Sequence, residues 1–177
     1  KSGGGPVIDI GVHVIDLTWY FMGKPKPISV SAATYNKIGD YKTKGVSRWI
    51  ALDADNIVFE TEDSASGFIR FENGATMTVD VSWAINGKDT GIFSNIFGTK
   101  AGASLNPFVI YDEQENYLFD SAPVINSENS FDNEINHFIE CIREGKEPIA
   151  TAEDGLEVQK MLNGIYDSAK LGREVTL

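Results

Sequence analysis

The sequence predicts one α+β domain over residues 1–177, built on a large, mostly antiparallel open sheet with helices packed on one face. Three observations support this class. An apolar helical run opens the chain, short alternating segments separated by turn residues follow, and two amphipathic helical segments close it. Helix, many strands, helix, helix is the order expected when helices gather on one face of a sheet. A chain of 177 residues is long enough to bury one full core.

The opening run is predicted to form a helix over residues 7–22. Three glycines at positions 3–5 let another group approach the backbone closely, and Pro6 suits the first turn of a helix. Gly23, followed by Lys-Pro-Lys-Pro, is a strong stop signal. Because the run is so apolar, we expect it to be buried around most of its circumference.

Alternation of apolar and small polar residues predicts the strands. We expect them at Ile28–Tyr35, Ile57–Thr61, Ala65–Phe71, Ala75–Trp83, Gly91–Phe97, Ala103–Leu105, Phe108–Asp112 and Tyr117–Phe119, with a short edge strand within Glu174–Leu177. Asn73-Gly74 predicts a type I′ hairpin turn. The regular alternation from 75 to 83 predicts a sheet with one packed and one polar face. Residues 36–55 are expected to form a long loop, for which a pocket wall, a subunit contact and a disordered excursion stay open. The local excess of Lys and Arg is interpreted as a solvated basic surface, with attraction of an anionic ligand as the competing interpretation.

Two further helices are expected at Phe131–Glu144 and at residues 151–171. The first is predicted to bury a stripe of Ile135, Phe138, Ile139 and Ile142 and to end at Gly145. The second begins with Thr151-Ala-Glu-Asp154, which has the form of a capping box.

Composition excludes several function classes. A net charge of −11 and the lack of a long basic run argue against binding nucleic acid or an anionic membrane. No uncharged apolar run reaches the length of a membrane span. The single Cys141 rules out internal disulfides and multi-cysteine zinc sites, and it fits a reducing cytoplasm, the expected location. The chain lacks an initiator Met and a leader segment, so we expect it to be cut from a longer protein.

Asp9, His13 and Asp16 are the candidate site residues. Their spacing of i, i+4 and i+7 places them on one face of the predicted helix. A carboxylate beside an imidazole supports proton transfer, and Asp16 is expected to brace the helix. A core histidine satisfied by a carbonyl is the structural alternative, and spacing alone leaves both open. A metal site made of the same three side chains is disfavoured, because ligands on successive turns of one helix converge poorly.

Two other motifs are interpreted as structural. His137 and Cys141 are expected on a solvated helix face, where the acidic neighbours disfavour a thiolate nucleophile. Residues 96–102 are predicted to form a turn between strands rather than a phosphate loop, and the chain contains no Gly-x-Gly-x-x-Gly or Walker lysine motif.

The segment Gly3-Gly4-Gly5-Pro-Val-Ile-Asp9-Ile-Gly11-Val-His13-Val-Ile-Asp16 resembles a motif of the glucose–fructose oxidoreductase and inositol dehydrogenase family (Gfo/Idh/MocA). Three later stretches are similar to that family too: the Phe71–Ala75 hairpin leading to Trp83, Phe97–Leu105, and Gly145–Pro148 with the following helix to Gly172. The resemblance therefore covers nearly the whole chain.

The resemblance implies that the chain is the C-terminal domain of an NAD- or NADP-dependent oxidoreductase acting on a sugar, polyol or cyclitol. His13 would transfer the proton, Asp9 would orient His13 or bind substrate, and Asp16 would support the helix. A homodimer or homotetramer would form through the open sheet face that carries Thr76, Thr78 and Ser82. A non-catalytic sugar-binding or regulatory relative and a dimerisation module are the alternatives.

The family's Glu-Lys-Pro motif belongs to the cofactor domain and is not found in this sequence. Lys24-Pro25 and Lys146-Glu-Pro148 each follow a helix end and do not replace it. We therefore expect residues 1–177 alone neither to bind NAD(P) nor to turn substrate over.

Overall fold

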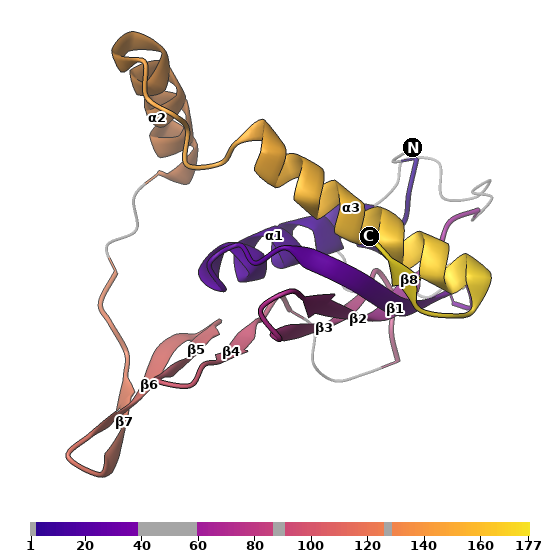
Figure 1. Ribbon diagram of the computed structural model, residues 1–177, viewed down its shortest axis with the longest axis horizontal. Coiled ribbons are helices and arrows are strands. Elements are labelled where there is room, and N and C mark those ends of the chain that lie inside the picture. Colours follow the sequence, from indigo (N-terminus) through magenta and orange to yellow (C-terminus); the bar gives the residue numbers. More distant parts are fainter. Residues whose placement is uncertain (1–2, 39–59, 87–90, 126–128) are drawn as a thin grey trace. The chain divides into compact units, whose positions relative to one another are not determined.

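The computed structural model describes residues 3–38, 60–86, 91–125 and 129–177 (Figure 1). In chain order, the elements are η1 (Val7–Gly11), α1 (Val12–Phe21), β1 (Pro27–Tyr35), β2 (Ser64–Phe71), β3 (Thr76–Ser82), β4 (Asn95–Phe97), β5 (Gly102–Leu105), β6 (Phe108–Gln114), β7 (Tyr117–Ser121), α2 (Ser130–Glu144), α3 (Ala152–Leu171) and β8 (Val175–Thr176). The predicted α+β class with antiparallel strands is confirmed.

Within the described ranges, the strands divide between two four-stranded sheets, ordered β3-β2-β1-β8 and β4-β5-β6-β7. The chain correspondingly separates into two compact units, Lys1–Thr90 with Glu157–Leu177, and Gly91–Leu156. The strands expected in one large sheet are therefore distributed over two. Alternation within a segment predicts a strand but carries no information on which other strands it joins.

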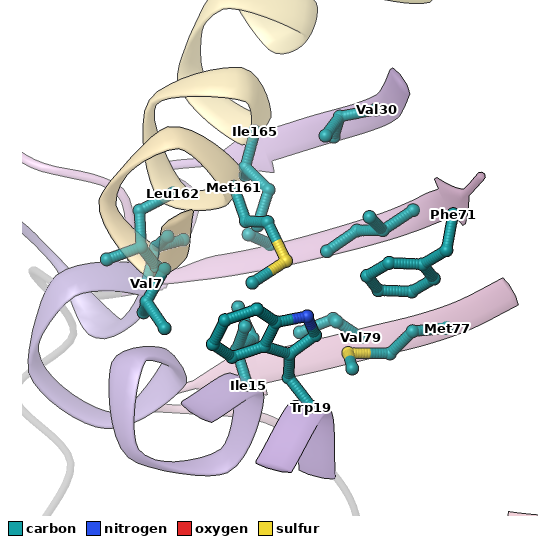
Figure 2. Packing of buried hydrophobic residues seen from close by; sticks show 13 residues of the cluster. Val7, Ile15, Trp19, Val30, Phe71, Met77, Val79, Met161, Leu162 and Ile165 are labelled. Carbon is teal, nitrogen blue, oxygen red and sulfur yellow. The ribbon is translucent and has the colours of Figure 1, made fainter. Parts of the chain in front are cut away.

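The first unit packs two helices on one face of its sheet. Val30 of β1 lies opposite Ile69 of β2, which in turn lies opposite Met77 of β3. Figure 2 shows side chains of α1 and α3, including Trp19 and Met161, pointing toward these strands. The cluster of buried side chains comprises Val7, Ile15, Trp19, Val30, Ala65, Ile69, Phe71, Met77, Val79, Val158, Met161, Leu162 and Ile165. Because each large apolar side chain contributes about 1.5–3 kcal/mol on burial, this cluster fixes the helix that carries the candidate site.

The opposite face of this sheet is polar on β3, as predicted from the alternation in 75–83, and Phe68 of β2 lies among its polar side chains. Ser31 lies opposite Phe68, and Phe68 lies opposite Thr78. Ser31, Thr76, Thr78 and Asp80 are exposed.

The hairpin turn between β2 and β3 differs from the predicted type. At residues 72–74 only Gly74 has a positive φ, of 85°, and its N–H donates to the Phe71 carbonyl (3.0 Å). Because a type I′ turn needs two positive φ values, this hairpin is instead a three-residue loop with glycine in the left-handed position. Glu115 and Asn116, at φ 54° and 68°, form the two-residue turn between β6 and β7. The type I′ prediction was wrong at 73–74, where the strand pairing leaves three residues in the loop.

The helix boundaries are close to the predictions. α1 is followed by Met22 and by Gly23 at φ 81°, where the Gly23 N–H donates to Tyr20 O and the Lys24 N–H donates to Trp19 O. This pair of bonds forms a Schellman motif. The capping box of α3 is present: the Thr151 N–H donates to Asp154 Oδ2 (2.9 Å), and the Asp154 N–H donates to Thr151 Oγ1 (3.1 Å).

The apolar stripe of α2 is exposed, which corrects the prediction of a buried stripe. Ile135, Phe138, Ile139 and Ile142 are between 38% and 68% exposed. Helical periodicity places these side chains on one face, but burial also needs an element to cover that face. The described part of the second unit supplies no such element.

Two predictions fall largely outside the described residues. Of the strand expected at 57–61, only Glu60 and Thr61 are described, and neither is in a strand. Of the loop at 36–55, only residues 36–38 are described. The predicted turn at 96–102 is confirmed, because Gly98 N–H donates to Ala101 O between β4 and β5. In the described ranges, no helix is long and apolar enough to cross a membrane.

Candidate active site

The candidate site lies on the first helical segment, whose start is fixed by Glu62. Glu62 Oε1 accepts hydrogen bonds from the Val7 N–H (3.3 Å) and from the Tyr166 hydroxyl (2.7 Å). A Cβ added at Gly5 would overlap the carboxylate and the backbone carbonyl of Glu62. The group that approaches Gly5 closely is thus the Glu62 carboxylate of the same unit. It lies at the start of a helix, where backbone N–H groups lack acceptors within the helix and favour a negative charge. Burial, followed by this bond to Glu62, raises the pKa of Tyr166.

The first helical turn is a π-helix. The Val12 N–H donates to the Val7 carbonyl, five residues back, and the chain then continues as the α-helix α1. Single π-turns inside helices are frequent at functional sites. Asp9 belongs to this turn and His13 to the first turn of α1.

Asp9, His13 and Asp16 are all exposed and share a face of this helix with exposed Leu17 and Tyr20. The opposite face buries Val7, Ile15 and Trp19 (among others) against the sheet. The prediction of a segment buried around most of its circumference was therefore wrong. The apolar side chains exceed what one sheet face covers, and the three ionisable groups remain in water, where they need no buried partner.

Asp9 is held by a tryptophan rather than by His13. The Trp83 Nε1–H donates to Asp9 Oδ2 at 2.9 Å. Trp83 follows β3 directly and lies 74 residues further along the chain. The residues around Trp83 in the sequence do not indicate this contact with Asp9, because a hydrogen bond between residues so far apart depends on the sheet register.

The side chains of His13 and Asp16 have no hydrogen bond or ion pair with any residue in the described part of the chain. The bracing contact expected of Asp16 is not among the described interactions. An exposed imidazole one helical turn from a fixed carboxylate can accept a proton from a bound hydroxyl group and return it.

Over the described residues, no group of three or more His, Cys, Asp and Glu side chains is placed to hold a metal ion. Asp9, His13 and Asp16 thus do not converge in the way that the metal alternative requires.

His137 and Cys141 on α2 have a structural setting that differs from the predicted solvated face. Cys141 is buried, and its Sγ lies 3.5 Å from His137 Nε2. The same nitrogen accepts a hydrogen bond from the Ile149 N–H (3.1 Å). These contacts hold the segment after α2 against the helix, which accounts for both side chains without a nucleophilic role.

The whole chain, residues 1–177, matches the family model GFO_IDH_MocA_C, described as "Oxidoreductase family, C-terminal alpha/beta domain". It is 35% identical over 179 residues to the D-glucoside 3-dehydrogenase of Escherichia coli K12, an alignment that covers 99% of this chain and 50% of that protein. The chain spans about half the length of the curated relatives that it matches.

Solved structures share the fold. An oxidoreductase domain protein from Kribbella flavida superposes with a TM-score of 0.80 at 21% identity, over 99% of this chain and 52% of that one. An oxidoreductase from Agrobacterium radiobacter in complex with NAD+, L-tartaric acid and magnesium superposes with a TM-score of 0.66 at 22% identity, over 96% of this chain and 48% of that one.

Proposed function

We propose that this chain is the substrate-side half of an NAD(P)-dependent sugar or glycoside dehydrogenase. The chain belongs to the Gfo/Idh/MocA oxidoreductase family and corresponds to the C-terminal alpha/beta domain of that family. One observation carries the proposal: Asp9 and His13 lie exposed on one helix face, and Trp83, the residue after β3, holds the Asp9 carboxylate. The name of the Escherichia coli relative supports a glucoside-like substrate.

In this proposal His13 moves the proton. Its neutral imidazole accepts the proton of a substrate hydroxyl group as the adjacent carbon is oxidised, and returns it in the reverse direction. Asp9 orients His13 or accepts a hydrogen bond from a neighbouring substrate hydroxyl group. Asp16 supports the same face from the next turn. The exposure of all three side chains supports the proposal, because a substrate can reach them.

We assign the nicotinamide cofactor to the part of the parent protein outside this chain. The glycine-rich stretch at residues 3–5 resembles the start of a phosphate-binding loop, but the Glu62 carboxylate occupies the space beside Gly5. A dinucleotide pyrophosphate does not fit there. When bound, NAD(P) supplies the hydride acceptor, and the Agrobacterium radiobacter complex with NAD+ supports this cofactor class.

The full-length parent protein tests the proposal. Purified protein is assayed for reduction of NAD and of NADP with a panel of D-glucosides and free aldoses. We expect turnover with at least one pair, and a loss of about 100-fold or more in His13→Ala and Asp9→Asn. The melting temperature should change little, because both side chains are exposed. An inactive wild-type protein would refute the enzyme assignment, and variants that melt early but keep turnover would indicate a structural polar stripe.

We further propose that the polar face of the first sheet, defined by Ser31, Thr76, Thr78, Asp80 and Ser82, forms a homo-oligomer contact. Small polar side chains allow a flat approach of a second sheet. Light scattering of the parent protein should show a dimer or tetramer, and Thr78→Arg should lower the mass. A monomeric parent would contradict this assignment.

A further inference from the structure

Trp83 is anchored by its backbone where β1 and β3 end and β2 begins. The Trp83 N–H donates to the Asp63 carbonyl (2.9 Å), and the Asp63 N–H donates to the Tyr35 carbonyl at the end of β1 (2.7 Å). Asp63 itself is fully buried, and its carboxylate accepts hydrogen bonds from the Ile38 N–H (2.6 Å) and the Ser64 hydroxyl (3.0 Å). The tryptophan therefore extends from a rigid position.

The indole of Trp83 is directed at Asp9 and not into the core. The side chain is 38% exposed, yet its one polar atom donates to Asp9 Oδ2. Because an indole N–H can only donate, this bond favours one oxygen of an ionised carboxylate and fixes the rotation of that group. Among the described residues Oδ1 has no hydrogen-bond partner, and Asp9 and His13 are both exposed.

Trp19 provides the contrast within the same unit. It is 2% exposed, and its Nε1–H donates to the backbone carbonyl of Pro25 at 2.7 Å. That tryptophan contributes burial and closes the end of α1. Trp83, by contrast, is 38% exposed, and its Nε1–H donates to a candidate catalytic carboxylate.

We propose that Trp83 is a positioning residue that orients the Asp9 carboxylate for its part in proton transfer at the substrate. This inference rests on the function proposed above. In this inference Asp9 orients His13 and does not bind the substrate, so the loss of Trp83 should slow turnover without weakening the binding of substrate.

The test uses the full-length parent protein with Trp83→Phe, which keeps an aromatic ring and removes the donor. Trp19→Phe is the matched control, since it removes the same donor from the core. Turnover is divided by the number of cofactor sites, counted by titration with reduced nicotinamide, so that a loss of folded protein does not lower it. For Trp83→Phe we expect kcat per site to fall about tenfold, with KM for the glucoside within about twofold and an unchanged melting temperature. Trp19→Phe should melt earlier and keep kcat per site.

The outcomes separate the inference from the function on which it rests. A wild-type protein with no dehydrogenase activity refutes the proposed function and the inference with it. Unchanged kcat per site in Trp83→Phe, with an active wild type, overturns the positioning role alone. A raised KM at constant kcat also overturns it and makes the tryptophan ring a substrate contact instead. If Trp83→Phe melts early, Trp83→Leu is measured per site in the same way, and an unchanged kcat there also refutes the inference.

Discussion

Replacing Gly5 by alanine tests why the chain needs glycine beside the candidate site. The φ of Gly5 lies outside the left-handed region, so an alanine there is not strained by backbone conformation. The added Cβ would instead overlap Glu62, both at its carboxylate and at its backbone carbonyl. A carboxylate can rotate away, but a backbone carbonyl next to β2 moves only if the chain moves.

The expected cost of Gly5→Ala is about 3 kcal/mol. Overpacking of a filled site costs about 1–3 kcal/mol, and the displaced Glu62 loses bonds to the Val7 N–H and the Tyr166 hydroxyl, each contributing roughly 0.5–1.5 kcal/mol. Urea unfolding of the chain, followed by tryptophan fluorescence, measures the loss. In the parent protein, turnover should fall as well, because the displaced segment carries Asp9.

Two comparisons make this prediction refutable. Gly155→Ala introduces the same methyl group in α3, where nothing lies within 4 Å, and should stabilise by up to about 1 kcal/mol. Glu62→Ala combined with Gly5→Ala removes the carboxylate but leaves the carbonyl, so it should restore less than half of the lost free energy. If Gly5→Ala is as mild as Gly155→Ala, the close approach of Glu62 does not explain the glycine.

Three further predictions concern the elements around the site. Trp19→Phe should lower the free energy of unfolding by about 1–3 kcal/mol in urea titrations, because the buried Pro25 carbonyl loses its donor. Thr151→Ala should cost about 1 kcal/mol, since it removes the side-chain acceptor of the capping box, whereas the exposed Thr176→Ala should cost less than about 0.5 kcal/mol. Burial and the hydrogen bond to Glu62 raise the pKa of Tyr166 in the folded state. The protonated hydroxyl group therefore contributes fully to the free energy of unfolding below the unfolded tyrosine pKa of about 10, and this contribution is lost as the pH rises above it. Tyr166→Phe should remove this alkaline loss in pH-dependent melting, and an unchanged slope would contradict it.

Local patterns in the sequence predicted the local structure of this chain well. Stop signals at Gly23 and Gly145, the capping box at Thr151 and the alternation before Trp83 each depend on residues a few positions apart. The three helices and most strands therefore appear close to their predicted bounds. The spacing of Asp9 and His13 likewise placed both on one face.

The errors concern what covers each element. Amphipathic spacing in α2 predicted a buried stripe, but this stripe is exposed in the described structure. The first apolar run predicted a helix buried on nearly all sides, but the face that carries Asp9, His13 and Asp16 is exposed. The hydrophobicity of a segment indicates that its surface favours burial, but it does not indicate which other segment packs against that surface. The type I′ prediction at Asn73-Gly74 failed for a related reason, since the loop length there is set by pairing between β2 and β3.

Two adjacent residues, Glu62 and Asp63, make the contacts that position the candidate site. Their sequence context did not indicate this role. The Glu62 side chain holds the Val7 N–H at the start of the π-turn, two residues before Asp9. The Asp63 carbonyl holds the backbone of Trp83, whose indole bonds the Asp9 carboxylate. Asp9 is thus positioned from both sides by the segment that leads into β2. In an exposed site, where packing does not restrict a side chain, such long-range hydrogen bonds are the means by which the fold fixes the geometry. The orientation of the Asp9 carboxylate should therefore respond to changes at Glu62 and Trp83 more than to changes at its helix neighbour His13.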